Sequence, residues 1–193
     1  MFGNPVGGRV AKHDRKAKTL LQLPTFVEKG DTTEVVIETP KGSRNKYAYD
    51  PEQRVFRLKK VLPAGMEFPF DFGFAPSTLA DDGDALDVLV LMDEPAFSGC
   101  VLRCRLIGVI EGEQRDKQRT IRNDRLIAVE CENHSYATFM RIDDLGKAFV
   151  RELEEFFVNY HRLDGARYRI RAVHGPREAK KQLRNAMKKY RDR

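Results

Sequence analysis

Residues 80–91 read ADDGDALDVLVL, and this stretch decides which fold the chain can form. Aspartates occupy positions 81, 82, 84 and 87 around Gly83, and apolar residues follow at once. A continuous apolar run of this kind is typical of a strand that is buried on both faces. The stretch therefore predicts a turn rich in carboxylates that leads directly into a strand of the core.

The aspartates are spaced so that their carboxylates can meet. If the chain is extended here, the side chains of Asp82 and Asp84 share a face, and Asp87 follows at the start of the strand. Carboxylates this close repel one another unless cations offset their charge. Because hard divalent cations prefer oxygen ligands, Asp82, Asp84 and Asp87 are candidates for a Mg²⁺ site.

Two other interpretations of the aspartates lead away from Mg²⁺. A calcium loop between two helices is excluded, because Leu86 and Asp93 would occupy its fifth and twelfth positions and strands are expected on both sides. A plain acidic turn stays open, since Asp-Asp-Gly-Asp is also favourable turn chemistry.

Basic and phenolic side chains lie in other segments, and a barrel would bring them opposite the aspartates: Lys46, Lys60, Arg125 and Tyr160. Cations on one wall of a site and metal-loaded carboxylates on the other suit a phosphate-rich substrate. Each residue alone has an ordinary explanation, since Lys46 can be a solvated strand residue and Tyr160 can belong to the core. Only the combination indicates a site.

Short strands come first in this chain, and two helices come late. Apolar patterns predict strands within residues 33–40, 46–58, 86–93, 101–113, 125–131 and 167–173, whereas Pro and Gly interrupt regular structure over residues 63–76. Helical spacing predicts one helix from Asp143 to Tyr160 and another over 176–193. The pattern is typical of a mainly β fold with α: a closed or partly open antiparallel barrel with helices packed outside it.

The length of 193 residues suits one domain, 1–193, with a basic N-terminal arm over residues 1–22. The terminal helix 176–193 is also basic, with eight Lys or Arg against Glu178 and Asp192. Its apolar residues recur at helical spacing, so the charges form a solvated face, and we do not expect nucleic-acid binding. The charged residues 112–124 have no packing pattern, and we expect a mobile hairpin at the barrel mouth.

Membrane and secretion signals are missing from the sequence. No apolar run approaches the roughly 18 residues of a membrane span, and residues 1–18 contain no apolar segment like that of a secretory signal. Cys100, Cys104 and Cys131 form no CxxC pair, and their odd number favours reduced thiols. We therefore expect a cytoplasmic protein without a membrane partner.

Five segments occur in the order found in the family I soluble inorganic pyrophosphatases, and the chain resembles that family: VVIETP, NKYAYDPE, FPFDFGF, DDGDALDVLVL and FFVNY. The resemblance extends from about Glu34 to the C-terminal helix. It implies a five-stranded OB-like barrel with two outer C-terminal helices. It also implies Mg²⁺-dependent hydrolysis of inorganic diphosphate and a homo-oligomer, which is a hexamer in bacterial members of this length.

The resemblance implies a role for each matching residue. Asp84 corresponds to the general base for the attacking water, and Asp82 and Asp87 correspond to Mg²⁺ ligands. Glu38 corresponds to a glutamate that supports a metal through its water shell. The phosphate-binding positions correspond to Lys46, Lys60, Arg125 and Tyr160.

Several positions depart from the family pattern. Phenylalanine replaces tyrosine at 68, 72 and 74, and Ala48 replaces a glutamate. Asn123 replaces a metal-binding aspartate, and the adjacent Asp124 would point to the other face of a strand. Lys60 stands for an arginine, and two lysines are replaced by Arg125 and His161.

These departures leave two alternatives to an ordinary pyrophosphatase. One is a catalytically weakened or inactive paralogue that binds a phosphate ligand or a partner protein. The other is a hydrolase of an organic diphosphate, in which the Phe-rich loop of residues 66–76 supplies an apolar wall.

Overall fold

The centre of the fold is a ring of five hydrogen-bonded strands. The computed structural model describes residues 19–26, 32–115 and 119–193. The strand order is β1-β4-β5-β8-β6, and β1 pairs with β6 to close the ring. The ring strands are Thr32–Thr39 (β1), Asp71–Phe74 (β4), Asp87–Leu91 (β5), Val101–Arg115 (β6) and Arg125–Glu130 (β8). The expected five-stranded, mainly β architecture is confirmed.

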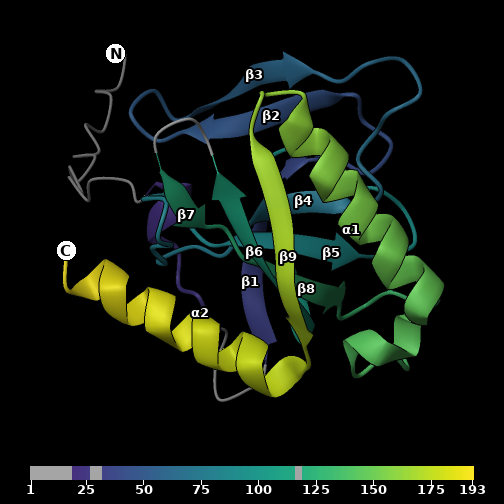
Figure 1. The fold of residues 1–193 in the computed structure, drawn as a ribbon. Coiled ribbons are helices and arrows are strands. Elements are labelled where there is room, and N and C mark those ends of the chain that lie inside the picture. The colour runs from purple at the N-terminus through teal and green to yellow at the C-terminus, as the bar shows by residue number, and fades with distance from the viewer. Residues whose placement is uncertain (1–18, 27–31, 116–118) are drawn as a thin grey trace, which may run out of the picture.

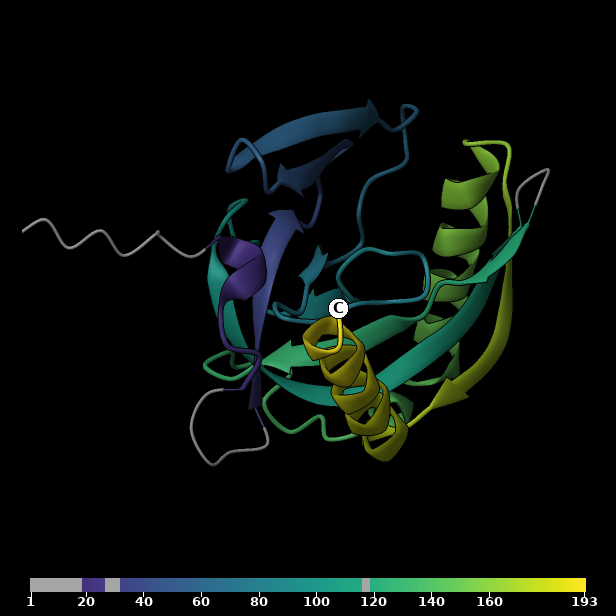
Figure 2. The same cartoon turned by 90° about the vertical axis from the view of Figure 1, so that its left-hand side faces the viewer.

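Further strands lie outside the ring. Thr120–Arg122 (β7) and Arg167–His174 (β9) both pair with β6. Asn45–Asp50 (β2) and Val55–Val61 (β3) form a separate two-stranded sheet, which lies at one end of the molecule (Figures 1 and 2). Residues 112–115 and 120–122 of the charged segment are thus hydrogen bonded in a sheet, while residues 116–118 lie outside the described residues.

The ring is not purely antiparallel, which corrects the expectation from the sequence. β5 and β8 run parallel, whereas the other four pairs of the ring are antiparallel. The reason is that β6, which follows β5 in the chain, pairs with β8 and β1 instead of with β5. The parallel register places Asp87 directly beside Arg125, at the first residue of each strand.

Residues 63–76 contain a strand that the sequence did not predict. Pro and Gly suggested irregular structure over residues 63–76, yet Asp71–Phe74 forms β4, and all of its residues are buried. A Cβ on Gly73 would overlap the carbonyl oxygen of Val36 in β1. Gly73 is therefore required by the close approach of two strands, and here it does not mark a loop.

Two helices cover the outside of the strands, as expected, and β9 connects them (Figure 1). Lys147–Arg162 (α1) packs Leu153 and Phe157 into one apolar cluster. Pro176–Arg191 (α2) packs Ala179, Leu183 and Ala186 into the other. The strands between the two clusters are buried on both sides, which explains the continuous apolar run of β5.

Two short segments differ in detail from the sequence-based expectation. The predicted helix start at Asp143 is a short 3-10 turn, Ile142–Leu145 (η2), and α1 begins after Gly146. Of the expected N-terminal arm, residues 1–18 lie outside the described residues, and Leu20–Gln22 forms a 3-10 turn (η1). Within the described residues, no helix has the length and apolar character to cross a membrane.

Candidate active site

One cavity of about 720 Å³ brings together seven of the eight residues singled out from the sequence. They come from β1, β2, the loop before β5, β5 itself, β8 and α1. The seven residues that line the cavity are Glu38, Lys46, Asp82, Asp84, Asp87, Arg125 and Tyr160. The fold therefore places carboxylates and cations from distant segments around one space.

The acidic loop is a compact turn, not the extended segment assumed from the sequence. Ala80 donates its N–H to the carbonyl oxygen of Asp84 at 2.8 Å, and Gly83 has a φ of 97°. The N–H of Asp84 donates to Asp82 Oδ1 at 3.1 Å. The turn, which needs a glycine at positive φ, is what directs both Asp82 and Asp84 into the cavity.

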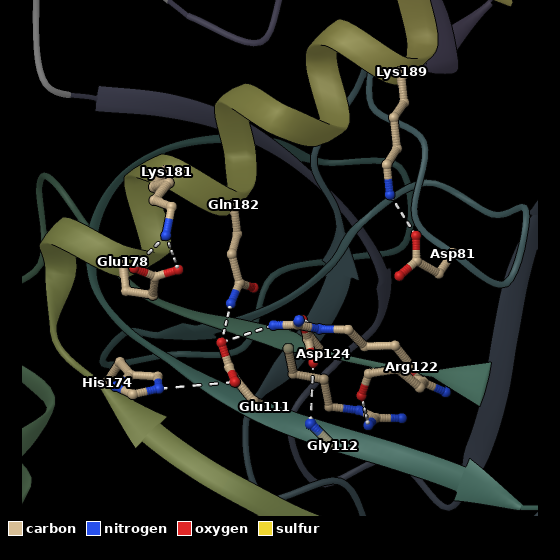
Figure 3. Close-up of polar contacts among 12 residues, drawn as sticks. Asp81, Glu111, Gly112, Arg122, Asp124, His174, Glu178, Lys181, Gln182 and Lys189 are labelled. Atoms are coloured by element: carbon tan, nitrogen blue, oxygen red, sulfur yellow. Dashed lines mark hydrogen bonds and ion pairs between the residues drawn. The ribbon is translucent and has the colours of Figure 1, made fainter. Parts of the chain in front are cut away.

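The four aspartates of residues 81–87 divide between two neighbouring cavities. Asp81 does not line the large cavity and instead forms an ion pair with Lys189 of α2 (Figure 3). Asp124 behaves as expected and faces away from the large cavity: it accepts a hydrogen bond from the N–H of Gly112 and pairs with Arg122. Asp81 and Asp124 line a smaller cavity of about 210 Å³ beside α2.

Asp87 is the most perturbed carboxyl group of the cavity. Burial raises its pKa to about 7, although the charges of Arg125 and Lys46 act in the opposite direction. The Nε atom of Arg125 lies 3.8 Å from Asp87 Oδ2, and 27% of the Asp87 side chain is exposed. A further cation in the cavity would favour the ionised form of this carboxylate.

The donor set fits a hard divalent cation that keeps part of its water shell. Asp82, Asp84 and Asp87 line one cavity, and carboxylate oxygens are the type of ligand that Mg²⁺ prefers. Over the described ranges, no three acidic, His or Cys side chains already stand together as ligands of one ion. Magnesium binds through one or two carboxylates plus waters and phosphates, so such a set is compatible with it.

Glu38 and Lys46 form an ion pair on the wall formed by β1 and β2. Lys46 Nζ lies 2.9 Å from Glu38 Oε2, and the N–H of Tyr49 donates to Glu38 Oε1 at 2.8 Å. The ammonium group also lies 4.1 Å from the centroid of the Phe72 ring. Both oxygens of Glu38 are thus engaged by protein donors, and Lys46 is held at the cavity wall.

Lys60 does not line the cavity, although its neighbour Lys59 does. Its Nζ pairs with Asp164 at 2.6 Å and lies 3.6 Å from the centroid of the Tyr160 ring. Burial raises the pKa of Tyr160, so its hydroxyl remains protonated and able to donate. Lys60 thus contacts two residues that line the cavity, Tyr160 and Asp164, without lining it itself.

The positions that depart from the family pattern also surround the cavity. Ala48, Phe72, Asn123 and His161 line it, whereas Phe68 is buried in the apolar cluster next to α1. The Asn123 amide donates to Gln114 Oε1 at 3.0 Å. His161 is the residue whose contacts the sequence did not indicate: it is 4% exposed and hydrogen bonded to Arg125.

The five-strand ring, the outer helices and a cavity of mixed carboxylates and cations define a class of enzyme that acts on phosphate compounds with bound metal. The chain belongs to the family I inorganic pyrophosphatases, because the family model described as inorganic pyrophosphatase matches residues 35–191.

Similar proteins support this membership. An inorganic pyrophosphatase of Synechocystis sp. is 41% identical over 133 residues, which cover 67% of this chain and 75% of the relative. One of Halalkalibacterium halodurans is 36% identical over 160 residues, covering 81% and 94%. The crystal structure of inorganic pyrophosphatase from Thermus thermophilus superposes with a TM-score of 0.83 at 32% identity, covering 90% of this chain and 99% of that one.

Proposed function

We propose that the cavity of this chain hydrolyses inorganic pyrophosphate to two phosphates, with Asp84 as the general base. As a family I inorganic pyrophosphatase, the chain is a metal-dependent inorganic diphosphatase. The observation that supports the assignment of residues is the convergence of seven of them on one cavity. Mg²⁺ is the proposed metal, and its proposed ligands are Asp82 and Asp87, with Glu38 acting through water.

Each residue of the cavity has a distinct task in this proposal. Bound Mg²⁺ would lower the pKa of the attacking water and neutralise phosphate charge. Asp84 accepts the proton of that water, which suits an exposed carboxylate of the loop. Lys46 and Arg125 donate to phosphate oxygens, and the protonated hydroxyl of Tyr160 donates to the same substrate.

Two pairs of opposite charge balance each other in the cavity before substrate binds. Lys46 pairs with Glu38 at 2.9 Å, and Arg125 lies 3.8 Å from Asp87. Substrate phosphate would compete for both cations, and metal would compete for both carboxylates. Metal and diphosphate are therefore expected to bind cooperatively, since each releases partners for the other. Lys60 is proposed to act indirectly, by holding Tyr160 in place.

We further propose a homo-oligomer in the cytoplasm. Large apolar side chains are exposed on β3 and nearby loops, including Val55, Leu58, Val61 and Phe97, and exposed apolar surface often marks an interface. The three cysteines are free thiols, in keeping with a reducing compartment. Light scattering after size-exclusion chromatography tests the assembly: a monomer of 22.2 kDa would contradict it.

Phosphate release from pyrophosphate in the presence of Mg²⁺ tests the proposed function. Asp84→Asn should lower kcat by about 10²- to 10⁴-fold, because a general base contributes about that much. Asp81→Asn is the matched control: it lies in the same loop but faces Lys189, so its activity should stay near that of the wild type. Equal activity of the two variants would refute the role of Asp84, and a silent wild type would refute the activity.

A further inference from the structure

The guanidinium of Arg125 is enclosed by aromatic rings, although it lines the cavity. Arg125 is 2% exposed. Its guanidinium carbon lies 4.2 Å from the centroid of Phe157 on α1 and 4.8 Å from the centroid of Tyr168 on β9. Arginine, with its planar and weakly hydrated head group, suits such stacking better than lysine does. The rings restrict where the guanidinium can lie.

Hydrogen bonds fix the rotation of the guanidinium within this space. Its Nη1 donates to the carbonyl oxygen of Asn123 at 3.2 Å, and its Nη2 lies 2.8 Å from His161 Nε2. Arginine is always a donor, so Nε2 of His161 must be the acceptor, and the proton of the imidazole must sit on Nδ1. Burial and the charges of Arg125 and Lys60 lower the pKa of His161 to about 3, which agrees with a neutral ring.

His161 is itself held in position by its neighbours. Its ring stacks on Tyr168, with centroids 4.7 Å apart and planes at 11°. The Tyr168 hydroxyl donates to the same Asn123 carbonyl oxygen at 3.0 Å. A Cβ on Gly112 in β6 would overlap Tyr168, so glycine makes room for the ring. Elements β6, β8, β9 and α1 thus form one frame around Arg125.

We propose that His161 is a positioning residue, which acts as a neutral acceptor that orients the Arg125 guanidinium for a phosphate group in the cavity. The inference rests on the proposed function, in which Arg125 contacts substrate. Two donors of the guanidinium are bonded within the frame, and Nε is buried without a hydrogen-bond partner among the described residues. Arginine carries five N–H donors, so donors remain for the ligand. Fixing them beforehand lowers the cost of orientation during catalysis.

Two substitutions at His161 separate the acceptor from the ring. His161→Phe keeps a ring to stack on Tyr168 but removes the acceptor, whereas His161→Gln keeps an acceptor oxygen and removes the ring. If the acceptor positions Arg125, His161→Phe should lower kcat about tenfold or more with KM changed less than about threefold. His161→Gln should retain most of the kcat of the wild type. The reverse order of the two variants would overturn the proposal.

A double-mutant cycle with Arg125→Lys distinguishes positioning from a general structural role. Lysine lacks the planar fork that His161 orients, so adding His161→Phe to Arg125→Lys should lower kcat by less than about threefold. An equal fold-loss in the two backgrounds would mean that His161 acts independently of Arg125 and would overturn the proposal. Circular dichroism and thermal melting of each variant confirm that folded proteins are compared.

The tautomer of His161 gives a measurement that needs neither activity nor a stable variant. Nitrogen-15 NMR of the wild-type protein with labelled histidine should show that one of its four histidines is neutral and carries its proton on Nδ1. The Nε2 atom of this histidine should be unprotonated and accept a hydrogen bond. A proton on Nε2 of His161 would overturn the proposal, because that nitrogen could not then accept from Arg125. If this tautomer is found in a protein without pyrophosphatase activity, the proposed function fails while the Arg125–His161 geometry stands.

Discussion

Acid titration of the buried histidine should measurably destabilise this protein. Burial, together with the charges of Arg125 and Lys60, lowers the pKa of His161 from its ordinary value of about 6.5 to about 3. The lowered native pKa means that the neutral ring contributes stability above pH 6.5, which is lost as the pH falls and the unfolded chain takes up the proton first. From pH 7.5 to pH 5 the loss is about 2 kcal/mol, and it reaches about 4 kcal/mol by pH 3.

Urea unfolding of the wild type and His161→Gln at pH 7.5 and pH 5 measures this loss. The free energy of unfolding of the wild type should fall by about 2 kcal/mol more than that of the variant between the two values. Asp87, the exposed His134 and His174, and the other titrating groups are present in both proteins, so their contributions cancel in the difference. Parallel pH dependences of the two proteins would refute the conclusion that His161 is buried in a neutral state.

Two further perturbations test the frame and the metal site. Gly112→Ala should lower the free energy of unfolding by about 1–3 kcal/mol and reduce kcat, because the added methyl group displaces Tyr168; unchanged urea unfolding and activity would contradict the close packing. Added Mg²⁺ should raise the melting temperature of the EDTA-treated wild type but raise that of Asp82→Asn by less, since a ligand stabilises only a site that binds it. An equal rise in both proteins would exclude Asp82 as a ligand.

Much of the site could be predicted because its chemistry is concentrated in short motifs. The four aspartates lie within residues 81–87, and the apolar run after them indicates a buried strand from local pattern alone. Lys46, Arg125 and Tyr160 could be named from the resemblance, and the structure brings all three to the cavity. Lys60 does not line the cavity. Its side chain is directed by the ion pair with Asp164, which lies 104 residues away in the chain, and by the Tyr160 ring.

Other features depended on contacts that no local pattern encodes. Gly73 and the prolines near it suggested a loop, whereas the approach of β1 makes glycine necessary in β4. β5 and β8 are parallel because β8, and not β6, lies beside β5. Apolar periodicity could not show this, since it is the same for a strand that runs in either direction. Tyr168 could have been predicted as a buried residue from one signal, its alternating position within residues 167–173.

The sequence by itself determined the family, the mainly β composition, and the carboxylates and cations of the site. These depend on residue type, short spacing and motif order, which are local properties of the chain. Only the tertiary structure decided which aspartate faces the cavity and which faces α2, and that His161 is a neutral partner of Arg125 instead of a further cation. The physical reason is that side-chain direction, burial and protonation are set by neighbours from distant strands and helices, through packing and desolvation.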